Sequence, residues 1–290
     1  MYKRTTVAGL LALAAALSPL TAGAQARDLV LAISEGTSGG TDHARVLAKY
    51  GGLANVIGDS IKRKVVVVFV REFSALEEGM KSGRFDFVMA RPSDYPARGL
   101  RNYGYHYVAH AKPDGQCLIV VPKNSPLNTL ADARGKRWVL PEKAAYMTKF
   151  CNAELRDQGI DLASEKVTYV REQSTIGSYL ESGFADVGGA ASYSGLAKDW
   201  VKAGHKVLHQ SVKQPYFPLI AGKSIAPKQV EAVQKQLTAI DTVASGPDIL
   251  KSVGIAGFDA SGEKQLRDLL AWLEKPATGA MAAQPIRQQP

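Results

Sequence analysis

The residues best placed to bind a small anion stand in loops that follow apolar runs. In the first such loop, Gly36, Thr37 and Ser38 precede a helical pattern that begins at Thr41. Backbone N–H groups and hydroxyls at a helix start can hold a carboxylate or another oxyanion. The alternative is an ordinary turn in which Thr41 caps the helix. The glycine spacing fits neither a dinucleotide fingerprint nor a P-loop, which disfavours nucleotide binding.

A second loop places an arginine directly after the apolar run at 85–90. The Arg91 guanidinium could pair bidentately with an anion. Tyr95 could stack on that anion or donate a hydrogen bond to it. The alternative is a surface arginine that pairs with Asp94. We predict that Arg91, Ser93 and Tyr95 contact a ligand.

Later loops complete the set of candidates. The loop at 142–148 offers an ammonium group, a phenol and a hydroxyl, and the loops after the apolar runs at 166–170 and 185–190 offer further polar groups. The residue at 174 could equally be a plain helix N-cap. We predict that these loops also contribute to the ligand site, through Lys143, Tyr146, Thr148, Gln173, Ser174 and Tyr193.

No pattern indicates catalysis or a metal centre. The five histidines, at 43, 106, 110, 205 and 209, lack tight metal-ligand spacing. No Ser/His/Asp order or activated nucleophile stands out. Tyr103, Tyr105 and Tyr107 alternate along one face of a strand pattern, which is more typical of packing than of a ligand platform. We therefore expect no catalytic residue, no metal site and no cofactor.

The N-terminus predicts export. Lys3 and Arg4 precede an apolar run at 7–17, and small residues with two A-x-A patterns follow at 22–26. These are the three parts of a secretory signal peptide, and the apolar run is shorter than the ~20 residues that cross a bilayer. The alternative is a buried N-terminal helix. We expect residues 1–24 to be a signal peptide, and the exported protein to have no nucleic-acid partner.

Export also bears on the two cysteines. Outside the cytosol, pairing is the default expectation. A bridge between Cys117 and Cys151 would close a loop of 34 residues and would contribute ~4 kcal/mol on the chain-entropy model. The alternative is a pair of buried thiols.

Composition bounds the class of protein. The 290 residues are 46% hydrophobic and 22% charged, which is sufficient to build a core. The 36 basic and 27 acidic residues give a net charge of +9, which permits anionic partners without establishing one. A fibre, a polytopic membrane protein and a small cystine-rich module are excluded.

Strand-like and helix-like segments alternate along the chain. Apolar or alternating runs predict strands at 29–33, 64–70, 85–90, 102–110, 117–121, 136–140, 166–170, 185–190, 206–210 and 216–221. Amphipathic periodicity predicts helices at 41–57, 73–82, 144–158, 174–182, 194–203, 227–244 and 263–275. Because the strand–helix rhythm occurs twice, we predict an α/β protein with two lobes, each a mostly parallel sheet flanked by helices.

The lobes are expected to be joined by two crossovers and separated by a cleft. We predict that 27–112 and 207–275 form lobe 1, that 113–206 form lobe 2, and that 276–290, rich in Pro, Ala and Gln, form a disordered tail. Ligands of open parallel sheets bind beyond the carboxyl ends of the strands. The candidate loops should therefore face the cleft.

Four stretches resemble a known family. They are 53–58 (LANVIG), 75–87 (ALEEGMKSGRFDF), 125–137 (SPLNTLADARGKR) and 179–187 (YLESGFADV). In this order and spacing they resemble the phosphate/phosphite/phosphonate-binding family of periplasmic solute-binding proteins. The resemblance implies a type II periplasmic binding fold, a periplasmic location, a small polar and anionic ligand, and delivery to an inner-membrane ABC permease. We expect a monomer that binds without catalysis.

One loop departs from the family pattern. In the family, a Ser/Thr-Gly run at the position of 142–148 grips phosphoryl oxygens, whereas only Thr148 retains such a hydroxyl here. Glu142 would repel a dianion, although Lys143 and Tyr146 could substitute, so a different small ligand is equally consistent. Two other roles stay open: a sensor of arsenite or another oxyanion that partners a histidine kinase, and a tripartite carboxylate-transport receptor, whose glycine-rich first loop resembles GTSGGTD.

Overall fold

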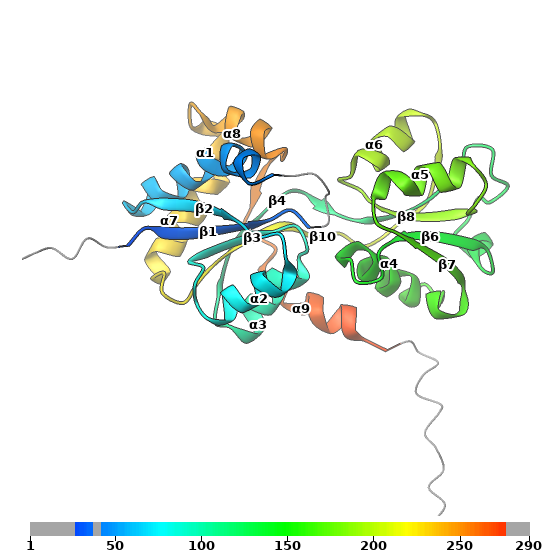
Figure 1. Ribbon diagram of the computed structural model, residues 1–290, viewed down its shortest axis with the longest axis horizontal. Coiled ribbons are helices and arrows are strands. Elements are labelled where there is room, and N and C mark those ends of the chain that lie inside the picture. The colour runs from blue at the N-terminus through cyan, green and yellow to red at the C-terminus, as the bar shows by residue number, and fades with distance from the viewer. Residues whose placement is uncertain (1–26, 37–41, 277–290) are drawn as a thin grey trace, which may run out of the picture.

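The computed structural model describes residues 27–36 and 42–276 and shows two sheets, each flanked by helices, side by side along the long axis (Figure 1). The described chain therefore has the two-lobed α/β architecture that the sequence predicts. The predicted signal peptide, and the predicted tail apart from Pro276, lie outside the described residues.

The first sheet has six strands in the order β11-β4-β10-β3-β1-β2. β1 pairs in parallel with β2 and β3, whereas β10 is antiparallel to β3 and β4. The strands of this sheet are β1 (Leu29–Ser34), β2 (Val65–Phe69), β3 (Phe87–Ala90), β4 (His106–Gly115), β10 (Gln214–Ala221) and β11 (Gly257–Asp259). Its helices are α1 (His43–Ile61), α2 (Phe73–Lys81), α3 (Asp94–Asn102), α7 (Pro227–Thr238), α8 (Gly246–Val253) and α9 (Glu263–Glu274).

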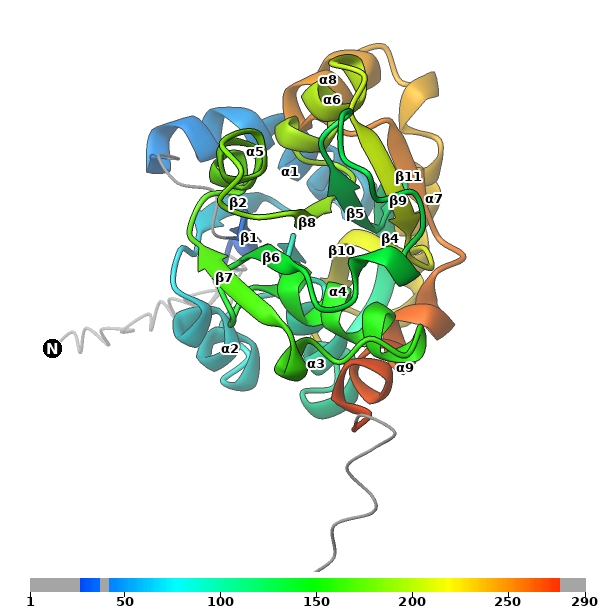
Figure 2. The same ribbon diagram turned by 90° about the vertical axis from the view of Figure 1, so that its right-hand side faces the viewer.

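The second sheet has five strands in the order β7-β6-β8-β5-β9. β6 pairs in parallel with β7 and β8, and β5 is antiparallel to β8 and β9. The strands are β5 (Cys117–Val121), β6 (Arg137–Pro141), β7 (Lys166–Val170), β8 (Val187–Ala191) and β9 (Lys206–Gln210). The helices are α4 (Tyr146–Asp157), α5 (Gln173–Glu181) and α6 (Gly195–Lys202), with α5 and α6 on one face of the sheet and α4 on the other (Figure 2).

Strand β1 shows that the first sheet is covered by helices on both faces. In β1, Leu31 and Ile33 pack in one apolar cluster with Tyr50 of α1, while Ala32 packs in another with Leu76 of α2. Successive side chains of a strand point to opposite faces. Almost every position of β1 is therefore apolar, because both of its faces are covered and five of its six residues are buried.

The chain passes between the sheets twice, after Gly115 at the end of β4 and after Gln210 at the end of β9. Both of these strand ends differ from the predicted lobe boundaries. β4 continues in the first sheet to Gly115, beyond residue 112, and β9 pairs with β5, so 207–210 belong to the second sheet. Sheet membership is set by pairing with a distant strand, which local pattern does not encode.

Two α-helices, α3 and α8, and the strand β11 have no counterpart among the predicted elements. The expected strand at 102–110 begins only at His106, and Tyr103 lies at the C-terminal end of α3. Pro96 and Gly99 weaken the sequence signal for this helix, because both residue types are unfavourable in helix interiors. A proline is tolerated in the first turn. Gly99 allows a close approach to β10, because a Cβ there would lie 2.4 Å from Ile220 Cδ1 and that side chain would have to shift.

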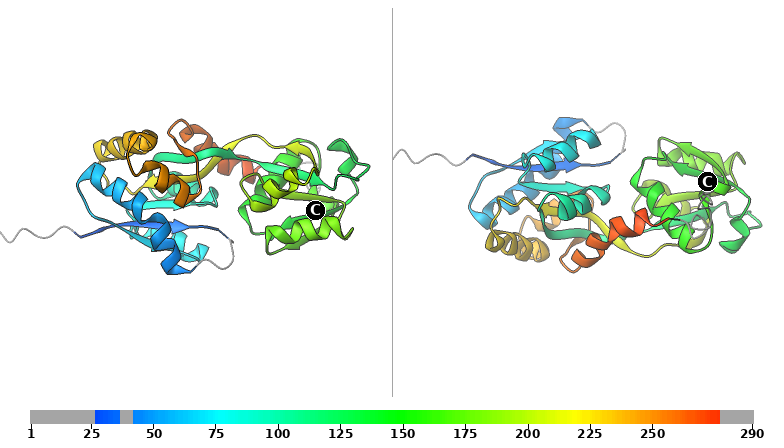
Figure 3. Two further views of the ribbon diagram at one scale, coloured as in Figure 1. Left: turned by 90° about the horizontal axis from the view of Figure 1, so that it is seen from above. Right: turned by 90° about the horizontal axis from the view of Figure 1, so that it is seen from below.

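Helix α9 follows the last strand of the first sheet, yet it also reaches α4 of the second lobe (Figure 3, right). The Trp272 ring packs edge-on against Phe150, with centroids 5.3 Å apart, and its Nε1 donates to Asp157 at 2.7 Å. Arg156 donates to the backbone oxygens of Trp272 and Lys275. Helix α9 of the first lobe is thus packed against and hydrogen-bonded to helix α4 of the second lobe.

Candidate ligand site between the lobes

A cavity of about 370 Å³ lies where the loops of the two lobes meet. Both sheets contribute residues that follow the carboxyl ends of parallel strands, as expected for this class of fold. The first lobe supplies Glu35, Gly36, Phe73, Arg91 and Pro92. The second lobe supplies Pro141, Ala145, Tyr146, Met147, Arg171, Glu172, Gln173, Ser174, Tyr193, Ser194, Gly195 and Leu196.

Arg91 brings a half-buried positive charge to the wall of this cavity. Its backbone N–H donates to Ser34 O at the end of β1, which fixes the residue beyond β3. The guanidinium lies 5.7 Å from the ring centroid of Tyr216 and 5.1 Å from that of Phe217. Its Nε is buried and has no hydrogen-bond partner among the described residues.

The surroundings of Arg91 keep it charged. Burial alone lowers its pKa, but Tyr216, Tyr50 and Glu35 outweigh that effect, and the net shift of the pKa is upward. An always-charged, planar guanidinium with an unused N–H is suited to an anion.

Glu35 lies beside this arginine and was not among the predicted residues. Its carboxylate accepts hydrogen bonds from Lys49 Nζ at 2.6 Å and from the Tyr50 hydroxyl. Burial raises the pKa of Glu35, but Arg91, Lys49 and Tyr50 lower it more, so the carboxylate is ionised. The only sequence signal was its place directly after a buried strand, next to Gly36.

Helix N-termini form much of the opposite wall. The first residues of α4, α5 and α6 all line the cavity. The N-caps of α4 and α5, Ala145 and Glu172, make no side-chain capping bond, whereas Ser194 caps α6 by accepting from Ala197 N. The leading N–H groups of a helix lack intrahelical acceptors and favour negative charge. Together with Arg91, they make the cavity suited to an anion.

Six of the predicted residues line the cavity: Gly36, Arg91, Tyr146, Gln173, Ser174 and Tyr193. Gln173 is positioned by its Oε1, which accepts from Ala191 N at 3.0 Å. The Tyr193 ring stacks on Tyr216 of the first lobe, with centroids 4.0 Å apart. Burial raises the pKa of the Tyr146 phenol, so its unpartnered hydroxyl stays protonated and able to donate. Their contact with a ligand stays a prediction.

Four predicted residues are not part of the cavity wall. The hydroxyls of Ser93 and Thr148 are buried and donate to the backbone oxygens of Pro215 and Pro141. Tyr95 packs behind Phe73, and Lys143 is exposed to solvent. The hydroxyls of Ser93 and Thr148 are thus used by nearby backbone oxygens and not by the cavity. The sequence alone could not distinguish these two roles. Thr37 and Ser38 lie outside the described residues.

Several apolar residues of the cavity wall were not predicted, because the prediction considered only polar or charged groups. Phe73, Pro141, Met147 and Leu196 stand at strand ends or helix starts. Their position relative to the predicted strands was the available signal. Within 27–36 and 42–276, no group of His, Cys, Asp and Glu could hold a metal ion, and the helices of that part of the chain are too short or too polar to cross a membrane.

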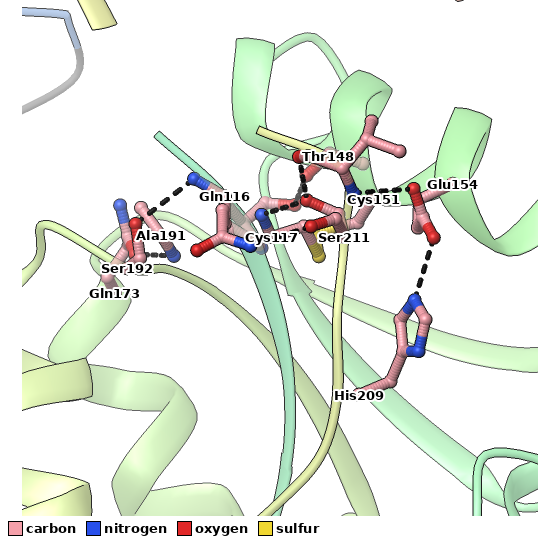
Figure 4. Close-up of a disulfide and its surroundings, with 12 residues drawn as sticks. Gln116, Cys117, Thr148, Cys151, Glu154, Gln173, Ala191, Ser192, His209 and Ser211 are labelled. Atoms are coloured by element: carbon pink, nitrogen blue, oxygen red, sulfur yellow. Dashed lines mark hydrogen bonds and ion pairs between the residues drawn. A yellow bond between two sulfur atoms is a disulfide. The ribbon is translucent and has the colours of Figure 1, made fainter. Parts of the chain in front are cut away.

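Behind this wall, Cys117 at the start of β5 and Cys151 in α4 form a disulfide with a Cα–Cα distance of 5.3 Å (Figure 4). Ser211 accepts a hydrogen bond from Cys117 N, and Glu154 of α4 is 2.7 Å from His209 Nε2. These contacts tie α4, whose first residues line the cavity, to the strands that lead to and from the crossovers.

The lobes also touch beside the cavity. Lys149 of α4 forms an ion pair with Asp94 of α3 at 3.0 Å, and the Asp94 carboxylate is almost fully buried. Arg98 lies 3.6 Å from the same carboxylate. The ion pair therefore spans the boundary between the two halves of the site.

Comparison with known proteins agrees with this geometry. The fold is similar to that of a Xanthomonas citri protein bound to ATP, with 16% identity over 84% of this chain and 96% of that chain, and a TM-score of 0.66. It is similar to PhnD1 from Prochlorococcus marinus (MIT 9301) in complex with methylphosphonate, with 12% identity over 84% and 96%, and a TM-score of 0.63. It is also similar to a binding protein component of an ABC phosphonate transporter from Pseudomonas aeruginosa, with 13% identity over 85% and 86%, and a TM-score of 0.60.

The model of one protein family matches residues 40–266, which is most of the chain. That stretch contains the four sequence motifs, the second lobe, the first lobe apart from β1 and most of α9, and every described residue of the cavity wall except Glu35 and Gly36. The chain therefore belongs to the phosphonate family of periplasmic substrate-binding proteins of ABC transporters.

Proposed function

We propose that the protein captures a small polar, anionic solute in the cavity between its lobes and presents it to an inner-membrane ABC permease. The observation that carries this proposal is Arg91, a permanently charged and half-buried residue at the cavity wall whose buried Nε has no hydrogen-bond partner among the described residues. The first turns of α4 and α5 add N–H groups opposite it. The complexes of similar proteins with methylphosphonate and ATP illustrate the range of phosphorus oxyanions that this fold accommodates.

Transport requires that the permease distinguish loaded from empty receptor. A ligand that contacts both lobes favours the arrangement in which they approach, and so shifts the population of conformations. The proposed location is the periplasm, which the family and the predicted signal peptide at 1–24 support. The alternative partner is a sensor kinase. Permease and ATPase genes beside this gene, rather than kinase and regulator genes, would support transport.

A thermal-shift screen of the protein without residues 1–24 tests the binding event. The panel comprises phosphate, phosphite, methylphosphonate, arsenite, small carboxylates and sulfonates. A ligand that binds only the folded state increases the unfolding free energy by about RT ln(1 + [L]/Kd), and Tm rises as a consequence. We expect at least one anion to raise Tm reversibly and without turnover.

A matched pair of variants locates the effect. Arg91→Gln removes the half-buried charge, whereas Arg267→Gln removes an exposed charge paired within α9 to Glu263. The first should abolish the shift and the second should preserve it. An Arg91→Gln protein that folds and binds with unchanged affinity would rule out the proposed site.

A further inference from the structure

The size of the cavity exceeds what a bare oxyanion needs. The cavity measures about 370 Å³. It falls within the ~300–1,000 Å³ that is typical of sites for small organic molecules. A phosphate-sized ion held at Arg91 would therefore leave most of the space filled with water.

Apolar side chains from both lobes form the rest of the wall. Phe73 and Pro92 come from the first lobe, and Pro141, Met147 and Leu196 come from the second. A ligand that is anionic throughout would remove these surfaces from water without contacting them favourably. A ligand with an apolar portion gains ~25 cal/mol for each Å² of apolar surface that it buries.

Phe73 is supported by a second aromatic ring. Its ring stacks on Tyr95 with centroids 5.1 Å apart and planes inclined by 23°. Arg98 lies over the Tyr95 ring at 4.7 Å and is itself held by Glu77 at 3.0 Å. A flat surface whose position is fixed before binding loses little freedom on contact with a ligand.

The charges around the cavity favour a single negative charge on the ligand. Of the ionisable side chains that line it in the described chain, Arg91 and Arg171 are positive and Glu35 and Glu172 are negative. Lys49 offsets Glu35 from behind at 2.6 Å. One added negative charge is therefore balanced, whereas a second would face two carboxylates with no further cation among the described wall residues.

We propose that the ligand is an organic monoanion with a flat apolar body, which contacts Phe73 while its acidic group binds Arg91. This inference rests on the proposed function, and it names the class of solute. Phe73 then sets specificity and Arg91 sets the requirement for an anion.

Calorimetric titration with matched ligands tests the proposal. The pairs are benzenesulfonate with methanesulfonate and benzoate with acetate; inorganic phosphate and methylphosphonate serve as small, more highly charged probes. In each pair the aromatic member should bind at least tenfold more tightly. Phe73→Ala should reduce that preference to less than threefold and leave the affinity for the small member unchanged, because the head-group contacts are intact.

Two controls and three outcomes complete the design. Phe184→Ala removes an exposed phenylalanine outside the cavity wall and should change nothing, and Phe73→Leu should restore part of the preference through apolar contact. Tightest binding of phosphate or methylphosphonate, lost in Arg91→Gln, would overturn this inference while supporting the proposed function. An aromatic preference that survives Phe73→Ala would also overturn it. Failure of every ligand to bind would contradict both.

Discussion

At the scale of single residues, the site contains two opposite charges close together, Glu35 and Arg91, and burial strengthens their interaction. Glu35 is 7% exposed and is held by Lys49 and Tyr50 on one side and by the charge of Arg91 on the other. A buried charged group is tolerated only when it is paired and hydrogen-bonded. Because its pKa is lowered in the folded protein, the ionised form of Glu35 stabilises the fold. Its charge also supports that of Arg91, the residue that we propose binds the anion.

Glu35→Gln tests the stabilising role. Because the pKa of Glu35 is lower in the folded state, its contribution is complete above the unfolded-state pKa, ~4.3, and is lost as the pH falls through the folded-state pKa. We expect the variant to lose about 1–3 kcal/mol of unfolding free energy at pH 7, and the difference from the unmodified protein to shrink below about pH 4. Urea unfolding at several pH values measures both.

The control for that experiment is Glu263→Gln, which breaks an exposed pair within α9. It should shift stability by less than about 1 kcal/mol at any pH. A Glu35→Gln protein with undiminished stability at pH 7 would show that the carboxylate is not stabilised as described.

At the scale of elements, α4 links the cavity to the boundary between the lobes. Its first residues line the cavity, Lys149 reaches Asp94 on α3, and Phe150 and Arg156 contact α9. A change at this helix is therefore expected to affect lobe closure as well as local stability.

Lys149→Met tests the ion pair across that boundary. Asp94 stays buried beside Arg98 alone, so we expect a loss of about 1–3 kcal/mol and faster release of ligand. In a double-mutant cycle, Asp94→Asn with Lys149→Met should be less destabilising than the sum of the single variants. Additive effects would mean that the two groups do not interact. Lys264→Met, which breaks an exposed pair within α9, is the control for charge removal.

Removal of the disulfide tests the link between α4 and β5. Its two cysteines are 34 positions apart and fully buried. Replacing both with Ala should lower the unfolding free energy by about 2–4 kcal/mol, because the unfolded chain gains conformational freedom. Guanidinium unfolding of oxidised and doubly substituted protein gives the difference. Equal midpoints would show that the bridge adds no stability.

At the scale of the whole molecule, the proposed function requires the two lobes to move relative to each other while they remain connected. Two crossovers, the Tyr193–Tyr216 stack and α9 all connect them. A ligand that bridges the lobes should therefore lower the radius of gyration measured by solution scattering. The decrease should be absent in Arg91→Gln. An unchanged radius at saturating ligand would show that binding does not close the lobes.

Much of this architecture followed from local pattern. The strands at 117–121, 166–170 and 206–210 were predicted with the bounds that the structure gives, because a short apolar or alternating run between turn residues is typical of a strand. The hidden helix α3 was missed because Pro96 and Gly99 obscure its periodicity, and Gly99 is explained by a neighbour more than a hundred residues away, Ile220. Distant packing of that kind leaves no trace in a local window.

The candidate site divides in the same way. Sequence order by itself determined that Arg91, Gln173 and Tyr193 follow strands, and parallel strands place such residues at one edge of a sheet. Only the tertiary structure decided that Thr148 and Ser93 turn to nearby backbone oxygens while Glu35 and Phe73 reach the cavity. The reason is physical: the direction of a polar side chain depends on which partner satisfies it, and that partner is supplied by the folded neighbours rather than by the adjacent residues.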